Sequence, residues 1–341
     1  MDPPSDINDG LARLRQLLHD EPSLGSWLQI CALIHRHGEL THCYALQHLS
    51  TWPEPWNHLH PTQDPNAPPL DLRGARLIGA DLRGFPLASA RLDKARLSYA
   101  DLSHADLSHA RLYCADLSHA NLTGAELGWS NLKLANLGAV KADEASFRHA
   151  RLDFTNLSHA SFRNAHLIGA QLSHANFEGA IFEGASLVDA ELGGCNLTGV
   201  GMTGAALRSA HLRAVKLIGA DLASAQLPVV DLSEGNLARA DLAHVDLRDA
   251  QMTGSILEGA CLHGALLEGA DLRHANLRGA DLNHARCRGA LLRGADLTGA
   301  NLRHADLRDV DLRDVNLDQA DLFGARGWQA TLARVWGALV P

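Results

Sequence analysis

The chain repeats a five-residue pattern without an insertion or deletion over three quarters of its length. Beginning at Leu72, every fifth residue through Leu322 is a repeat centre, and Leu occupies 43 of these 51 centres. Ala occupies 37 of the 51 positions two residues before the centre, and Asp and Asn are the commonest residues one position before it. A repeat of this regularity constrains the fold more than any other feature of the sequence.

A period of five fits neither an α-helix nor an extended strand. Residues five apart are separated by about 140° around a helix, and they fall on opposite faces of a strand. Every fifth Leu can be buried if each pentad is a short strand-like edge followed by a bend, with the centre and the small residue two positions earlier pointing inward. Gly is the commonest residue two positions after the centre, and Gly and Ser suit such a bend. The sequence therefore predicts an all-β solenoid.

The repeat resembles the pattern A-[DN]-L-x-x of the pentapeptide repeat family. The pentads ADLSH, ANLTG, ADLRD and ANLRG follow this pattern residue by residue, and the resemblance covers residues 70–325. It implies a right-handed quadrilateral β-helix with four pentads per turn, and 51 pentads then make about 13 coils. Each coil contacts only its neighbours, so both ends are expected to need caps.

The segment before the repeat has the features of such a cap. Residues 1–52 form a predicted helical segment, with helices over residues 8–19, about 26–37 and about 40–49. Residues 53–69 follow as a Pro-rich linker. The predicted helices carry apolar residues at helical spacing: Leu11, Leu14 and Leu18; Trp27, Ile30 and Ile34; Leu40 and Tyr44.

Residues 326–341 form a predicted C-terminal helix. Its apolar face either covers the last coil or, as the resemblance to quinolone-resistance pentapeptide proteins implies, also joins two copies into a homodimer. The residues of this face are Trp328, Leu332, Val335, Trp336 and Leu339.

Composition and charge exclude several classes of protein. The net charge of -9 disfavours direct binding to nucleic acid or to an anionic membrane, since both need a basic surface. The excess of acid is greatest before the repeat, where residues 1–69 carry eight acids and three bases. The six cysteines show no disulfide or zinc spacing, and neither a signal peptide nor a membrane span is visible. We therefore expect a soluble, cytoplasmic protein.

No motif in the chain predicts catalysis, a cofactor or a metal ion. Gly199, Gly201 and Gly204 spell G-x-G-x-x-G, but they lie inside two pentads with no strand-to-helix unit to hold a dinucleotide. A run of aspartates from Asp309 to Asp321 imitates a calcium loop, yet Asp314 occupies the position of its glycine. We therefore expect a protein that is not an enzyme.

Outward residues must be compared at a spacing of twenty, because one coil contains four pentads. At this spacing Cys114, Leu134 and Phe154 share one column, with Tyr113 beside it and Trp129 around the next corner. An apolar strip on a polar surface marks a partner-binding patch, a site covered by the N-terminal helices or linker, or scattered apolar residues that are merely tolerated.

A second column carries carboxylates, at Asp221, Asp241, Asp281 and Asp321. The family resemblance implies that such a column imitates the phosphates of DNA and binds a type II topoisomerase. Arginines interleave with these aspartates, and alternating charge is typical of a solvated face with paired charges.

Three functional hypotheses follow. The chain is a general scaffold that binds another protein through the apolar column, a DNA mimic that binds DNA gyrase or topoisomerase IV and gives drug or toxin resistance, or a translocated bacterial effector. The column rule also predicts that Phe162 stacks on Phe182 and that His284 stacks on His304. By the same rule His104, His109 and His119 leave from different sides and gather no ligand.

Overall fold

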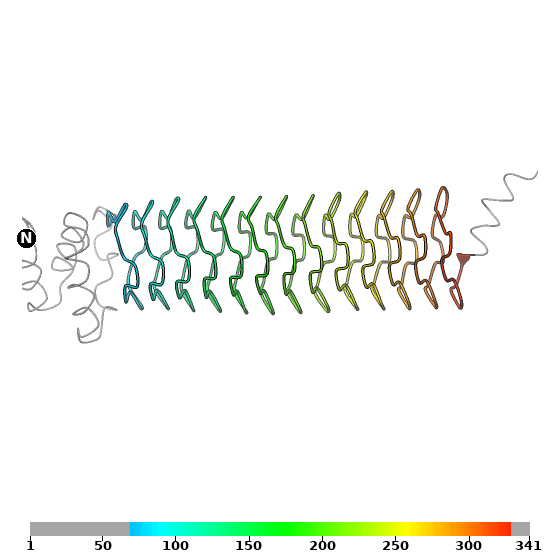
Figure 1. Cartoon of the computed structure of the whole chain (residues 1–341), viewed down its shortest axis with the longest axis horizontal. Helices are drawn as coiled ribbons and strands as arrows, with labels where there is room; N and C mark the ends of the chain where they lie inside the picture. The colour runs from blue at the N-terminus through cyan, green and yellow to red at the C-terminus, as the bar shows by residue number, and fades with distance from the viewer. Residues whose placement is uncertain (1–68, 329–341) are drawn as a thin grey trace, which may run out of the picture. The chain divides into compact units, whose positions relative to one another are not determined.

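The computed structural model describes residues 69–328, in two compact units, Met1–Ser161 (unit 1) and Phe162–Pro341 (unit 2). In each unit the chain winds into coils of twenty residues that stack side by side (Figure 1). Parallel bridges join residues twenty apart, as Asp71 to Arg91 in unit 1 and Asp221 to Asp241 in unit 2. Four pentads therefore complete one coil.

The β-structure consists of single-residue bridges and contains no longer strand within residues 69–328. The bridges recur every five residues from Asp71 to Arg326. A pentad donates two hydrogen bonds to the next coil and accepts one from it. The amide of Leu72 donates to the carbonyl of Arg91 at 2.8 Å, that of Gly74 donates to Asp93 at 2.9 Å, and the carbonyl of Leu70 accepts from the amide of Arg91 at 2.8 Å. Every coil is thus held by its neighbours, as the repeat predicts.

Each pentad ends in a tight turn whose second corner residue is left-handed. The amide of Ala95 donates to the carbonyl of Leu92 at 3.0 Å, and Lys94 between them has a φ of 59°. The same corner position has a positive φ throughout the repeat, as a type II turn requires, although glycine occupies only some of these positions. The bend is therefore set by the backbone and accepts many residue types.

The inward columns form the core. Hydrophobic residues at these positions, from Leu72 to Leu312, are at most 4% exposed. In unit 2 the rings of Phe162 and Phe182 lie 4.9 Å apart and within 7° of parallel, which confirms the predicted aromatic stack. Phe177 packs edge-on against both rings.

The last described coil is less well buried, because its inward residues Val315, Leu317, Ala320 and Leu322 are partly exposed. Of the predicted C-terminal helix the structure describes residues 326–328, and Trp328 among them is partly exposed too. The rest of that helix, the N-terminal helical segment and nearly all of the Pro-rich linker lie outside the described residues. The right-handed sense of the coil remains a prediction. Between residues 69 and 328 no helix is long and apolar enough to cross a membrane.

Candidate functional site

Large apolar side chains face solvent on unit 1. Hydrogen bonds from the amide of Cys114 to Lys133 and from that of Leu134 to Asp153 place Cys114, Leu134 and Phe154 in successive coils of one corner column. Leu134 is 49% exposed and Phe154 52%, while Cys114 is half-buried. Tyr113 is 39% exposed next to Cys114, and Trp129 is 60% exposed at the preceding corner. The structure thus brings the five predicted residues onto one side of the coil.

These corner residues have a backbone conformation that favours glycine. The φ angles of Leu134 and Phe154 are both 59°, and that of Trp129 is 60°. A left-handed conformation costs a residue with a side chain about 1–2 kcal/mol, and exposing an apolar side chain gives little in return. Large apolar residues at strained, exposed positions are a feature for which folding alone gives no reason.

Two aromatic residues of unit 1, Trp129 and the additional Tyr99, stack on histidines of the next coil. The rings of Trp129 and His149 lie 4.4 Å apart at 26°, and those of Tyr99 and His119 lie 4.8 Å apart at 5°. Tyr99 is 63% exposed at the corner that follows the Cys114 column. It was missed in the sequence because it lies one column away from the apolar strip, although the spacing of twenty already pairs it with His119.

Basic residues share the face that carries Tyr113. Bridges join Asp71 to Arg91, Arg91 to Arg111, and Asn131 to Arg151, so three arginines follow one column beside the apolar residues. We call this surface the Tyr113 face. It comprises residues 71, 91, 111, 131 and 151, residues 73, 93, 113, 133 and 153, and the corner residues Lys94, Cys114, Trp129, Leu134 and Phe154. With six bases against three acids, its formal charge is +3.

The acids of the Tyr113 face are held by ion pairs. The guanidinium of Arg111 lies 3.3 Å from the carboxylate of Asp93, and the ammonium of Lys133 lies 3.3 Å from that of Asp153. The carboxylate of Asp93 and that of Asp153 each contain at least one buried oxygen that accepts no hydrogen bond within the described part of the chain. Arg151 is exposed and has no ion-pair partner there. The face therefore keeps a net positive charge after its internal pairing.

The thiol of Cys114 contacts the phenol of Tyr113, and this contact raises the pKa of Tyr113 above its usual value. The phenol is therefore neutral at physiological pH. It adds no negative charge to the Tyr113 face.

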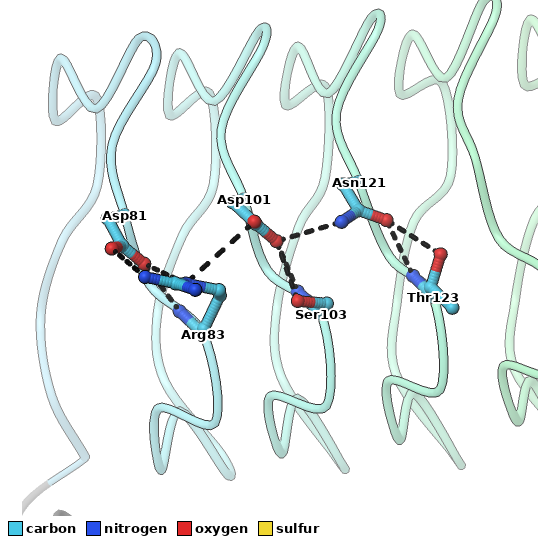
Figure 2. Close-up of polar contacts among 6 residues, drawn as sticks. All are labelled: Asp81, Arg83, Asp101, Ser103, Asn121 and Thr123. Atoms are coloured by element: carbon cyan, nitrogen blue, oxygen red, sulfur yellow. Dashed lines mark hydrogen bonds and ion pairs between the residues drawn. The ribbon is translucent and has the colours of Figure 1, made fainter. Parts of the chain in front are cut away.

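The bridge positions before the centres carry a polar ladder, which Figure 2 shows in unit 1. The side chain of Asp101 accepts a hydrogen bond from the amide of Ser103 at 3.0 Å and another from the amide group of Asn121, one coil on, at 3.0 Å. Asn121 accepts from Thr123 in the same way. Asp and Asn are thus frequent before the centre because their side chains cap the turn that follows.

The predicted acidic column follows the same rule in unit 2. The carboxylates of Asp221, Asp241 and Asp281 each accept a hydrogen bond at 3.0 Å from the amide two residues on. Asp321 accepts from Phe323 at 3.0 Å, and Arg303 forms an ion pair with it at the same distance. The bridge ladder of this column contains Cys261 and Asn301 between the aspartates. The structure therefore places the four carboxylates in one column but uses each of them to cap a turn.

Arginines neutralise much of the acidic surface of unit 2. The guanidinium of Arg273 contacts the carboxylate of Asp271 at 2.6 Å, and that of Arg313 contacts Asp311 at 2.5 Å. These contacts hold the pKa of both carboxyls below the usual range, chiefly through the side-chain hydrogen bond from the arginine two residues on. This arrangement matches a solvated face with paired charges better than a row of free phosphate mimics.

Histidines fill the corners of the coil without forming a metal site. The rings of His284 and His304 lie 5.0 Å apart at 15°, which confirms the predicted pair. His263 of the neighbouring column lies edge-on to His284 at 5.9 Å and to His244 at 5.3 Å. Within residues 69–328 no three His, Cys, Asp or Glu residues are arranged to hold a metal ion.

Comparisons with known proteins agree with the repeat. The family model for pentapeptide repeats matches eight copies, over residues 71–108, 100–138, 145–184, 182–213, 220–259, 260–299 and 290–326. No curated protein matches the chain. Among solved structures, HetL, a pentapeptide repeat protein involved in heterocyst differentiation regulation from the cyanobacterium Nostoc, is 34% identical. The match covers 61% of this chain and 90% of HetL, with a TM-score of 0.32.

Two other solved structures are similar to parts of the chain. A pentapeptide repeat protein from the thylakoid lumen of Arabidopsis thaliana is 39% identical over 25% of this chain and 66% of its own, with a TM-score of 0.21. QnrB1, a plasmid-mediated fluoroquinolone resistance protein, is 20% identical over 65% of this chain and 97% of its own, with a TM-score of 0.29. Since the family model matches most of the sequence between residues 71 and 326, the chain belongs to the pentapeptide repeat family.

Proposed function

We propose that the protein is a non-enzymatic binding module that holds a protein partner on its Tyr113 face. The observation that carries this proposal is the column of large apolar side chains in left-handed corners of unit 1. Leu134 and Phe154 expose about half of their surface there at a cost in backbone strain. Exposed apolar residues of this size on a polar surface are typical of a protein interface.

The test compares full-length variants in partner capture. Leu134→Asp together with Phe154→Asp places two carboxylates in the apolar column without altering the inward residues. Val229→Asp is the matched control, because Val229 is 61% exposed at a left-handed corner of unit 2. Capture of a specific protein, identified by mass spectrometry, should be lost in the double variant and kept in the control. Equal capture by both variants would overturn the proposal.

A more specific function is the binding of a type II topoisomerase such as gyrase through DNA mimicry, with drug or toxin resistance as the result. The column of Asp221, Asp241, Asp281 and Asp321 supports this function, whereas the interruptions at Cys261 and Asn301 and the neighbouring ion pairs reduce its negative field. A supercoiling assay with purified gyrase, with and without a fluoroquinolone, tests it. Absence of any effect at micromolar concentrations of the protein would remove gyrase from consideration and leave the Tyr113 face as the binding surface.

A further inference from the structure

The Tyr113 face begins where the N-terminal segment joins the coil. We propose that residues 8–49 of this same chain dock on the Tyr113 face and cover its apolar column, so that a partner has to displace them. This inference rests on the proposed function, since it concerns the regulation of the same surface. It commits to one occupant, the N-terminal segment of the chain, and the following observations favour it.

The first observation is the position of the tether. The carbonyl of Leu70 accepts a hydrogen bond from the amide of Arg91 at 2.8 Å, and Asp71 opens the bridge column that continues through Arg91 to Arg111. The chain therefore enters the coil on the Tyr113 face itself. Leu134 lies three coils further along, at a distance of about 15 Å for strands spaced by about 4.8 Å. The 17 residues of the linker, 53–69, can span about 50 Å in an extended polyproline conformation.

The second observation is apolar complementarity. Residues 8–19 carry Leu11, Leu14 and Leu18, and residues 26–37 carry Trp27, Ile30 and Ile34. The spacing of three and four residues gives each segment one apolar stripe if it is helical. A helix of either segment is about 18 Å long, which matches a column that extends over a few coils. Contact between the apolar stripe of such a helix and the apolar column of the Tyr113 face would remove both apolar surfaces from water.

The third observation is charge. The docking residues 8–49 contain four acids and three bases, a net charge of -1, and residues 1–68 as a whole carry -5, whereas the Tyr113 face has a formal charge of +3. Opposite charge favours this encounter over one with the arginine-paired carboxylates of unit 2. Because the two partners belong to one chain, the effective concentration is on the order of millimolar, so weak contacts are enough to keep the face covered.

The cysteines of the chain provide a direct test in the full-length protein. Cys31 and Cys43 belong to the proposed docking segment, and Cys114 lies in the apolar column. Cys261 is the internal control, because it has the same partial exposure and belongs to unit 2. Purified protein at micromolar concentration is treated with bismaleimidoethane, and the monomer is digested for mass spectrometry.

We expect links from Cys31 or Cys43 to Cys114 within one chain, at least about tenfold more abundant than links to Cys261, as a millimolar effective concentration requires. The variant Leu134→Asp with Phe154→Asp should reduce the Cys114 link by at least about fivefold, through the loss of apolar contact. Labelling of Cys114 by a monofunctional maleimide measures its accessibility in both proteins. Val229→Asp should leave the link unchanged.

Three results would overturn the inference: no link to Cys114 although both thiols react with the monofunctional reagent, equal links to Cys114 and Cys261, or links that occur only between chains. The experiment also separates the two proposals. If the link forms but no partner is captured even after Leu11→Asp and Leu14→Asp weaken docking, the proposed function fails and the docking stands. If a partner is captured but no link forms, the docking alone fails.

Discussion

Replacing Gly294 by Ala tests whether the histidines at the corners stabilise the coil. Gly294 has a φ of 72°, and a Cβ added there would lie 2.6 Å from Nδ1 and 2.9 Å from Cε1 of His274, whose ring packs over the glycine of the next coil. Gly299 has a φ of 68°, and a Cβ added there would meet nothing within 4 Å. The two glycines thus share a backbone conformation and differ in the ring above them.

The difference between the two variants isolates the contact with the ring. In Gly299→Ala the left-handed conformation alone should lower the free energy of unfolding by about 1 kcal/mol. In Gly294→Ala the exposed His274 ring must also move away and loses its packing on the backbone, which adds about 0.5–1 kcal/mol. Urea unfolding of the full chain, followed by far-ultraviolet circular dichroism, measures both values.

A double-mutant cycle with His274→Ala completes the test. If the ring contact stabilises the coil, the cost of Gly294→Ala falls to that of Gly299→Ala in the absence of the ring, with a coupling energy of about 0.5–1 kcal/mol. Equal costs for both glycines in the wild-type background, with additive effects in the cycle, would refute the reasoning. The histidine rings at the corners would then contribute nothing measurable to the stability of the coil.

Two further predictions concern the carboxylates and the core. Arginines hold the pKa of Asp71 at about 2 and lower the pKa of Asp271, whereas both carboxyls have a pKa of about 4 in the unfolded chain. Their ionised forms therefore stabilise the fold at a pH above about 4, and this stabilisation is lost as the pH falls. The midpoint of urea unfolding should decrease between about pH 5 and pH 2, and an increase would contradict this prediction. Phe182→Leu removes a ring whose centroid lies 4.9 Å from that of Phe162 and 5.2 Å from that of Phe177. This variant should lower the free energy of unfolding by about 1–2 kcal/mol, as measured by urea titration. An unchanged midpoint would show that Leu fills the site equally well.

The inward-facing residues could be predicted from the sequence, because the five-residue period determines which positions point into the coil. Every residue at a repeat centre from Leu72 to Leu312 is buried, so the stack of Phe162 on Phe182 followed from their spacing of twenty alone. The same spacing predicted the pair of His284 and His304. Both pairs depend on backbone register, which never shifts along the repeat.

The contacts of the outward side chains were harder to predict from the sequence, because these side chains also contact residues of neighbouring columns. His263 packs edge-on against His284 of the neighbouring column, and Arg111 reaches Asp93 of the neighbouring column. The strain at Leu134 was also not visible in the sequence, since a bend that suits Gly and Ser was expected and the structure imposes a positive φ on every residue type. The candidate surface was predicted as an apolar strip, and its basic component emerged only from the folded columns.

The bridge of each residue to the one twenty positions later has a consequence for how such a chain can change length. Loss or gain of a single pentad leaves the Leu and Ala columns intact, since every centre still falls on an inward position. It nevertheless rotates all later pentads together by one side of the coil. Residues beyond the change keep their neighbours twenty positions away, but their columns no longer continue the columns before the change, and new neighbours arise only in the coil at the junction. Only changes of a whole coil keep the earlier and later columns aligned. A genetic duplication of one pentad would therefore be silent for folding and would disrupt recognition on a surface that crosses the junction.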